Sequence, residues 1–508
     1  MTYLRNIRIY LIVIVSGILL SLPFSYPSLY IVSWIGLIPF LYVIKELKEN
    51  RINYWNIFVL GTVLGTTIIL SSAAWLYYPL IDFSGMPWFL SVFVFILVFI
   101  LFGFIYGIWS LLYIYIRQKE GVSPFWLAIS WTAVEYLRFT LIPALPFGFI
   151  AYTQGQFSSL VQLAEYGGFY LITFIVLLIN GYIYKLFLKK KIKYGIPLFI
   201  IFILITTHGM IRINNYNNKD YQAIKVGIVQ TNLTPEEKWK FENIKPNMDY
   251  LISESRTILA EEPLFILWPE SALTFDMVRN EYYREKFMEK LSDVDTYIQI
   301  GSLAIIDKNN EKYNSSFLIS PDNNIKNRYN KNKLVPFGEY MPLADIVETL
   351  TGLSMVSEIP GNEITKFQIS EVRWKTVICS ELLYPQLTAE KINNVDFVVN
   401  QSNEAWYRKG NLQKQMWASA IFRAVENRRT VVRSGNKAYG GAVSPAGLPI
   451  VRNHSRDDTS FIVQIPLNKE TTLYHRWGDY TGYISVMIVL LLFFIKIVII
   501  IYRKKKGF

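Results

Sequence analysis

Seven apolar segments of near membrane-spanning length crowd the first 211 residues of this 508-residue chain, and an eighth lies near its end. They lie at about 9–23, 26–44, 53–76, 88–116, 124–141, 161–184, 195–211 and 481–502. About 20 apolar residues in a helix span the bilayer core, where a helix satisfies its own backbone hydrogen bonds. The sequence therefore predicts an α-helical membrane domain over residues 1–211, with seven transmembrane helices. A C-terminal transmembrane helix at 481–502 brings the total to about eight.

The basic residues between these segments predict their orientation. Lys and Arg occur in every second loop, at 45–51, 117–119 and 185–191, whereas the loops near 25, at 77–88 and at 142–160 contain neither. Because basic loops stay in the cytoplasm, we expect both termini to be cytoplasmic and residues 212–480 to lie outside. The net charge of +12 gathers in these loops and in the tail at 503–506, so it does not indicate a nucleic-acid partner.

Two polar features accompany the predicted spans. Glu135 and Arg138 are three residues apart, share a helix face and can neutralise each other, either as a buried structural pair or in a substrate role. The turn-rich loop at 143–148 fits an interfacial anchor or part of a lipid entrance.

Residues 220–470 have the pattern of an α/β domain. Short β-rich runs lie at about 223–232, 264–268, 296–305, 315–319, 372–378, 397–399, 431–434 and 461–465, with helical runs at 236–259 and 412–427. Strands separated by helices and followed by paired strands predict an α/β sandwich. The long irregular stretch at 331–364 predicts a functional loop, and we expect it to move as a lid.

Cys379 is the only cysteine in the chain, so no intrachain disulfide can form. It follows a β-branched, apolar run at 376–378, and Pro385 opens a predicted helix. A thiol at such a junction can be exposed on a rigid backbone, where nearby helix N-terminal amides favour its thiolate. A buried cysteine acting as a small hydrophobe fits the same stretch.

Two further strand ends carry reactive groups. Glu270 follows the run at 264–268 after Trp268 and Pro269, while Lys331 follows another predicted strand and Glu339 lies in the long loop. A carboxylate base, a lysine cation and a thiol nucleophile together suffice for acyl transfer. The three histidines show no ligand-like spacing, so neither a metal site nor serine-hydrolase chemistry is predicted.

These groups stand in motifs that resemble a known family. The motifs are Trp268-Pro269-Glu270, Tyr329-Asn330-Lys331 with 334–339, Asn403-Glu404-Ala405-Trp406, and 423–428 with Arg433-Ser434. The order Glu, Lys, Cys resembles the nitrilase superfamily. With about eight spans, nearly the whole chain resembles the apolipoprotein N-acyltransferases of the bacterial envelope.

The resemblance implies an αββα sandwich of nitrilase type, held outside the bacterial cytoplasmic (inner) membrane and facing the periplasm. It also implies transfer of an acyl chain from a phospholipid to the N-terminal amine of diacylglyceryl-cysteine lipoproteins. The expected partners are these two substrates and membrane lipids, with no cofactor, and the protein is expected to be a monomer.

The resemblance also assigns roles to single residues. Cys379 would hold the acyl group as a thioester, Glu270 would be the base and Lys331 the stabilising cation. Glu339 would orient Lys331 or shuttle protons, and Glu381 would line the pocket. The supporting residues would be Trp239, Asn403 and Trp406. Ordinary packing would explain these three residues equally well.

Two stretches depart from the family pattern. Ser380 occupies a position where the family often has an aromatic residue. Residues 144–147, Ala-Leu-Pro-Phe, occupy the part of the outer loop where the family commonly has Gly-Phe-Pro-Trp. The first departure bears on the acyl pocket and the second on lipid entry. The alternatives are a membrane-anchored nitrilase-type amidase or lipid hydrolase with the same triad, and a non-catalytic scaffold or transporter, which seven spans with few buried charges do not favour.

Overall fold

The structure is a computed structural model that describes residues 2–49, 53–83, 87–116, 123–142, 146–306, 311–336, 338–340, 357–408, 410–454 and 459–505. The chain divides into two compact units. The first comprises Met1–Asn215, Lys409–Ala418 and Arg476–Phe508, and the second comprises Tyr216–Arg408 and Ser419–His475. Most of the predicted lid, at 341–356, lies outside the described residues, as does 143–145 of the predicted outer loop.

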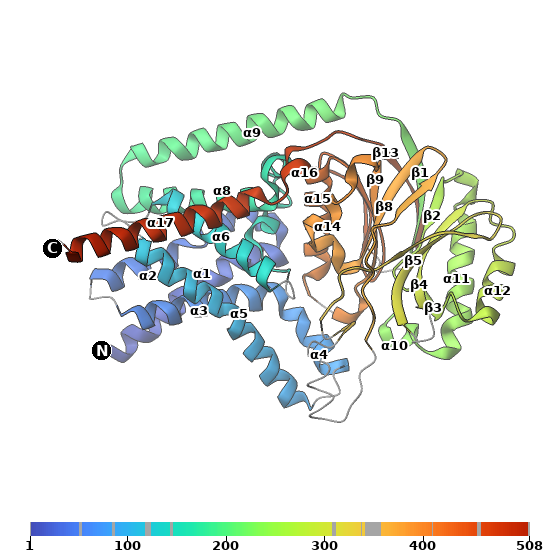
Figure 1. Cartoon of the computed structure of the whole chain (residues 1–508), viewed down its shortest axis with the longest axis horizontal. Helices are drawn as coiled ribbons and strands as arrows, with labels where there is room; N and C mark the ends of the chain where they lie inside the picture. The colour runs from blue at the N-terminus through green and yellow to red at the C-terminus, as the bar shows by residue number, and fades with distance from the viewer. Residues whose placement is uncertain are drawn as a thin grey trace. The chain divides into compact units, whose positions relative to one another are not determined.

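The first unit is helical (Figure 1). Its described elements are α1 Thr2–Ser25, η1 Pro27–Trp34, α2 Ile38–Glu49, α3 Tyr54–Ala73, η2 Ala74–Leu76, α4 Tyr77–Phe83, α5 Trp88–Ile116, α6 Pro124–Leu141, η3 Ile150–Gln154, α7 Ser158–Val161, α8 Ala164–Lys189, η4 Ile192–Tyr194, α9 Gly195–Asn217 and α17 Tyr480–Lys505.

Seven helical stretches among the described residues are long and apolar enough to cross a membrane. They are Ile7–Ser25, Pro27–Leu47, Tyr54–Phe83, Trp88–Ile116, Ala164–Lys189, Ile192–Asn217 and Tyr480–Arg503. The predicted span at 124–141 forms α6 but is not among them, because Glu135 and Arg138 lower its hydropathy. About eight spans is therefore an approximate count.

The predicted span at 26–44 is broken rather than continuous. η1 ends at Trp34 and α2 begins at Ile38; between them the Ile35 amide donates to the Val32 carbonyl at 3.2 Å and the Ile38 amide to the Ile35 carbonyl at 3.0 Å. Asn180 on α8 adds two further bonds: its Nδ2 donates to the Ser33 carbonyl at 2.8 Å, and its Oδ1 accepts from the Leu37 amide at 3.0 Å. Irregular backbone at membrane depth needs such partners.

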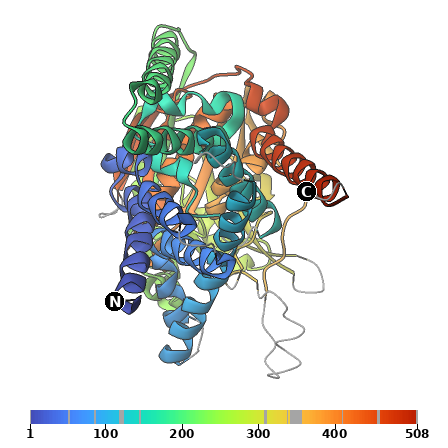
Figure 2. The same ribbon diagram turned by 90° about the vertical axis from the view of Figure 1, so that its left-hand side faces the viewer.

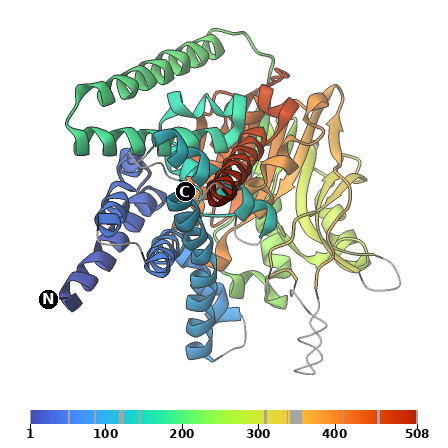
Figure 3. The same ribbon diagram turned by 60° about the vertical axis from the view of Figure 1, so that its left-hand side comes forward.

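Small residues bring α3 and α5 together. A Cβ at Gly61 would lie 2.6 Å from the Tyr106 carbonyl, and one at Gly103 would lie 2.7 Å from the Thr62 carbonyl. Close backbone approach at glycine is a common basis of helix packing in membranes. By contrast, α9 stands apart from the blue helices of the N-terminal part in Figures 2 and 3.

The second unit contains two stacked sheets (Figure 1). Its described strands are β1 Ala223–Gln230, β2 Phe265–Leu267, β3 Leu273–Asp276, β4 Tyr297–Ile306, β5 Glu311–Ile319, β6 Ile325–Asn330, β7 Lys366–Ile369, β8 Val372–Ile378, β9 Phe397–Asn403, β10 Thr430–Asn436, β11 Tyr439–Val443, β12 Pro449–His454 and β13 Thr459–Pro466. In the described part of the chain one sheet has the order β13-β1-β2-β4-β5-β6, with β3 on β4, and the other has β12-β11-β10-β9-β8-β7.

Helices cover the outer faces of both sheets (Figure 1). The helical elements here are α10 Pro235–Lys238, η5 Phe241–Asn243, α11 Ile244–Thr257, η6 Leu259–Glu261, α12 Glu281–Lys290, η7 Cys379–Leu383, α14 Pro385–Ala389, η8 Ile392–Asn394, η9 Ala405–Tyr407, α15 Leu412–Asn427 and α16 Leu473–Trp477. α11 and α12 lie on the first sheet, and α14 with residues 419–427 of α15 lies on the second. The predicted αββα sandwich is therefore confirmed.

Aromatic rings fill the space between the sheets. Phe265 of the first sheet stacks on Trp374 of the second with ring centroids 4.7 Å apart, and Trp374 stacks on Phe397 at 5.5 Å. All three side chains are fully buried. Because rings of this size bury much apolar area, this cluster fixes how the sheets pack.

The predicted strands and the helix at 412–427 are present, whereas the helix predicted at 236–259 is wrong in its extent. The chain forms α10, then η5, and starts α11 at Ile244. Pro246 explains the late start, because proline fits the first turn of a helix but breaks its interior. The pattern also missed β3, β7, β11 and β12, which are short or rich in glycine and polar residues.

Candidate active site

Glu270 lies just beyond the carboxyl end of β2. The Trp268 amide donates to the Gln299 carbonyl at 2.9 Å, after which the chain leaves the sheet and Ser271 takes a φ of +46°. Gly301 on β4 makes room for this turn, because a Cβ there would lie 2.5 Å from the Pro269 carbonyl oxygen and 2.8 Å from the Glu270 Cα. The Glu270 side chain is therefore held rigidly and is 5% exposed.

Lys331 approaches the same carboxylate from β6. β2 and β4 are parallel, and both β4 and β6 are antiparallel to β5, so β2 and β6 end at the same edge of the sheet. The fully buried Lys331 ammonium donates to Glu270 Oε1 at 3.4 Å and to Glu339 Oε1. Burial alone would lower the pKa of Lys331, but the charges of Glu339 and Glu270 outweigh it and raise that pKa well above its ordinary value. Lys331 is therefore a permanent cation.

Cys379 follows the last residue of β8 and has a φ of +52°. A non-glycine residue in the left-handed region is strained, and such residues cluster at functional sites. Asn400 Nδ2 donates to the Cys379 carbonyl at 3.3 Å, and the Ser402 hydroxyl lies 3.8 Å from Sγ. The half-buried thiol is thus presented by a sharp turn between β8 and η7.

The thiol is protonated at rest. Burial raises the pKa of Cys379, and the negative charge of Glu270 raises it further, against a smaller opposing effect of Lys331. The favourable effect of local amides on the thiolate is smaller than the effect of burial. The Asn403 amide does lower the pKa, but burial prevails. Cys379 needs a base to become a nucleophile.

Glu270 has an oxygen available to act as that base. Its Oε1 accepts from Asn314 Nδ2 at 2.8 Å and from Lys331, whereas its buried Oε2 has no hydrogen-bond partner among the described residues. An unsatisfied buried carboxylate oxygen is costly, so such an atom indicates a proton-accepting or ligand-binding function.

Glu339 and Glu381 organise the backbone around these groups. Glu339 Oε2 accepts from the Val335 amide at 2.8 Å, while Oε1 binds Lys331. Glu381 is fully buried, and its role in lining the acyl pocket stays a prediction. Its Oε2 accepts from the Ile378 amide at 2.6 Å and its Oε1 from the Asn332 amide at 2.6 Å. It thereby ties the residue before Cys379 to the residue after Lys331.

The three remaining predicted residues differ in their surroundings. Asn403 ends β9, is 4% exposed, and accepts from Asn436 Nδ2 at 2.9 Å. Trp406 is half-buried in η9, and Trp239 is 39% exposed at the end of α10. Asn403 is therefore part of the polar support, while Trp239 offers an exposed ring that does not serve the core.

Sequence reasoning missed a polar network behind Cys379. The buried Arg433 donates to Glu404 Oε1 at 2.8 Å and to Asn400 Oδ1 at 2.9 Å, and Ser402 donates to the same Glu404 oxygen at 3.1 Å. It also missed Lys238, whose Nζ donates to the Glu270 carbonyl at 2.9 Å. Glu404 and Arg433 lie within the family motifs given above, so those motifs could have identified them as site residues. No such signal marks Lys238.

The polar pair of the first unit has local partners. Glu135 accepts from Trp131 Nε1 at 3.0 Å, from the Ile150 amide at 3.1 Å and from Thr173 Oγ1 at 2.7 Å. The Arg138 guanidinium lies 4.0 Å from the centre of the Phe149 ring. These contacts favour the structural reading of the pair.

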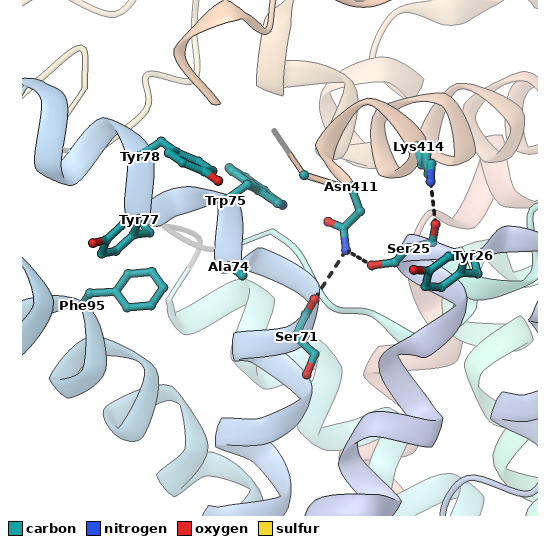
Figure 4. Close-up of a pocket in the computed structure, with 11 residues that line it drawn as sticks. Ser25, Tyr26, Ser71, Ala74, Trp75, Tyr77, Tyr78, Phe95, Asn411 and Lys414 are labelled. Carbon is teal, nitrogen blue, oxygen red and sulfur yellow. Dashed lines mark hydrogen bonds between the residues drawn. The ribbon is translucent and has the colours of Figure 1, made fainter. Parts of the chain in front are cut away.

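The first unit also contains a pocket of about 570 Å³ (Figure 4). It is lined by Ser25, Tyr26, Ser71, Ala74, Trp75, Tyr77, Tyr78, Phe95, Gly410, Asn411 and Lys414. Asn411 Nδ2 donates to Ser25 Oγ at 2.9 Å, and Lys414 Nζ donates to the Ser25 carbonyl at 2.6 Å. The lining combines aromatic rings with one amine, and it includes none of the predicted catalytic residues.

Comparisons with known proteins match both units. Residues 16–182 match the family model described as apolipoprotein N-acyltransferase N-terminal domain, and residues 225–473 match the one described as carbon-nitrogen hydrolase. The second match agrees with the nitrilase-like class of the αββα sandwich.

Similar curated proteins cover most of the chain. An apolipoprotein N-acyltransferase of Geobacter metallireducens is 27% identical, over 94% of this chain and 93% of the relative. One of Rickettsia bellii is 25% identical, over 96% and 97%. Among solved structures, an amidase from Nesterenkonia sp. is 13% identical with a TM-score of 0.38, over 48% of this chain and 91% of the amidase.

Proposed function

Because the chain belongs to the apolipoprotein N-acyltransferase family, we propose that it N-acylates lipoproteins through a cysteine thioester. In this proposal a phospholipid donates the acyl chain, and the N-terminal amine of a diacylglyceryl-cysteine lipoprotein accepts it. The observation that carries the mechanism is the grouping of Glu270, Lys331 and Cys379. Lys331 binds Glu270, whose Oε2 has no hydrogen-bond partner among the described residues, and the charge of Glu270 raises the pKa of the Cys379 thiol.

In the first half-reaction Glu270 takes the proton of Cys379, and the thiolate attacks the ester carbonyl of the phospholipid. Lys331 stabilises the oxyanion, because its charge is already in place before the reaction. The new C–S bond forms, the ester C–O bond breaks, and the proton on Glu270 passes to the leaving lysophospholipid alkoxide. The acyl group then remains on Cys379.

In the second half-reaction the lipoprotein amine attacks the thioester carbonyl. The C–N bond forms and the C–S bond breaks, while Glu270 accepts a proton from the amine and returns it to the Cys379 thiolate. A thioester splits one difficult transfer into two easier ones, provided that water is excluded at the second step.

The supporting carboxylates act by positioning. Glu339 holds Lys331 and the Val335 backbone, so the ammonium stays at the place where negative charge develops. Glu381 holds the two backbone segments that carry Cys379 and Lys331. For Trp239 and Trp406 we propose contacts with the acyl chain or the acceptor, which the exposed ring of Trp239 supports.

The lipid donor and the orientation complete the proposal. We assign residues 1–211 and 481–502 to the membrane domain and 220–470 to a catalytic domain on the periplasmic side, because the basic loops all fall on one side. The aromatic rings and the amine of Lys414 in the pocket of Figure 4 suit an acyl chain and an anionic headgroup.

Intact mass spectrometry after incubation with phospholipid tests the proposal. We expect wild-type protein to gain one acyl mass that neutral hydroxylamine removes, and Cys379→Ala to gain none. Ser253→Ala, an exposed change on α11 that keeps the thiol, is the control and should load normally. Adding a diacylglyceryl-cysteine peptide should then discharge the acyl group as an amide.

Two outcomes would refute the proposal. Release of free fatty acid without amide product would favour the lipid hydrolase. A Cys379→Ala protein that still acylates the peptide would show that the thioester is not on the path.

A further inference from the structure

Lys238 is a buried lysine that the proposed mechanism does not use. It ends α10, whose first turn is fixed because Thr234 Oγ1 accepts from the Glu237 amide at 3.2 Å and Glu237 Oε2 accepts from the Thr234 amide at 2.8 Å. The Lys238 side chain turns inward and is 2% exposed, whereas the next residue, Trp239, is 39% exposed. A well-capped turn therefore holds the Lys238 ammonium group in the protein interior.

The Lys238 ammonium is directed at the base of the candidate triad. Its Nζ donates to the Glu270 backbone carbonyl at 2.9 Å, at the turn where Gly301 makes room. The charged groups that act on it are Glu270 and Cys379, both of which favour its protonated form. Burial nevertheless lowers the pKa of Lys238 to about 8, as expected for a cation withdrawn from water.

The charges around Cys379 explain why a second cation is needed. Among the described residues, Glu270 and Glu339 share the ammonium of Lys331, which leaves an excess of negative charge beside a thiol that must ionise. That excess opposes the thiolate, because like charges in a low-dielectric site repel strongly. Lys238 supplies the missing positive charge from the opposite end of Glu270.

We propose that Lys238 is a positioning residue of this site, whose buried ammonium fixes the Glu270 backbone and offsets the negative charge against which the Cys379 thiolate forms. The inference rests on the proposed roles of Glu270 and Cys379. It does not depend on the identity of the acyl donor or acceptor, because it concerns only the ease with which the thiol loses its proton.

Another buried lysine provides a matched control. Lys375 on β8 is fully buried, and its Nζ donates to the backbone carbonyls of Leu387 and, at 2.8 Å, Glu390. It has the same chemistry and a similar burial, but its carbonyl partners belong to α14 and its end rather than to the triad. Replacing it tests the cost of losing a buried lysine as such.

Alkylation of Cys379 by iodoacetamide measures the proposed effect directly, since the chain has no other cysteine. The rate is followed from about pH 6 to pH 10, which brackets the ordinary thiol pKa, for wild type, Lys238→Met, Lys238→Arg and Lys375→Met. We expect Lys238→Met to react at least about tenfold more slowly at neutral pH, with its profile moved to higher pH by about one unit or more. At neutral pH, Lys238→Arg and Lys375→Met should stay within about threefold of wild type, which is less than half a pKa unit.

Each outcome decides whether Lys238 acts through its positive charge or only by filling space. Lys238→Met reacting as fast as wild type, or Lys238→Arg reacting as slowly as Lys238→Met, would overturn the proposal. If thermal unfolding shows that Lys238→Met does not fold, Lys238→Arg decides alone. Arginine keeps its charge at every pH, so its rate should rise more steeply above about pH 8 than that of wild type, whose Lys238 loses its proton there. Identical wild-type and Lys238→Arg profiles would then refute the inference. Acyl transfer by the wild-type protein is measured separately, so that failure of the Lys238 inference can be distinguished from failure of the proposed function.

Discussion

Gly301→Ala should displace Glu270 without changing its carboxylate group, and so tests whether the position of Glu270 matters for the reaction. The new Cβ would lie 2.5 Å from both the Pro269 carbonyl oxygen and the Ser271 amide nitrogen, whereas ordinary contacts begin at 3.4 Å. The obstructing atoms are backbone, so the turn at 269–271 must shift by about 0.9 Å, the difference between these two distances. Glu270 would move with the turn.

A displacement of about 1 Å at a reacting group costs on the order of a hundredfold in rate. The 3.4 Å contact between Glu270 and Lys331 is already long and would be lost with such a shift. Overpacking of this kind costs about 1–3 kcal/mol of stability, which a folded domain tolerates. We therefore expect the rate of acyl loading onto Cys379 to fall roughly a hundredfold while the protein remains folded.

The assay is the rate of thioester formation, followed by intact mass, together with thermal unfolding of the same sample. Gly195→Ala is the control, since a Cβ there meets nothing within 4 Å. Acyl loading of Gly301→Ala within about threefold of wild type would refute this prediction, because the position of Glu270 would then not limit the reaction.

Three further predictions concern the supporting residues and the topology. Glu381→Gln replaces a buried acceptor oxygen by an amide donor facing backbone N–H groups, so unfolding free energy should fall by about 3 kcal/mol, and an unchanged melting temperature would contradict this. Glu339→Gln removes the carboxylate that most strongly raises the pKa of Lys331, so the alkaline limb of the rate profile should move to lower pH, and a limb that stays in place would argue against a role for the Lys331 charge. In a Cys379→Ala background, an impermeant maleimide should label Lys469→Cys but not Lys190→Cys in intact cells, and the reverse pattern would invert the proposed orientation.

The two-part organisation of the protein can be predicted from its amino-acid sequence alone. Apolar runs of about 20 residues have no soluble alternative, so the helical unit followed from length and hydropathy. Short runs of β-branched and apolar residues located β1, β4 and β8, because such runs are typical of strands buried on both faces of a sheet. The motifs around Glu270, Lys331 and Cys379 placed each residue just after a strand, and the structure brings these strand ends together.

How these groups interact depends on contacts that form when the chain folds. The protonation of Cys379 depends on burial and on the Glu270 charge, which come from distant parts of the chain. Glu381 binds the backbone at Ile378 and Asn332, contacts that no spacing reveals. Lys238 lies 32 residues before Glu270 in the sequence, and its direction inward follows from how α10 packs. Desolvation and long-range charge arise only when the chain is folded, so sequence patterns name the reactive groups but not their ionisation.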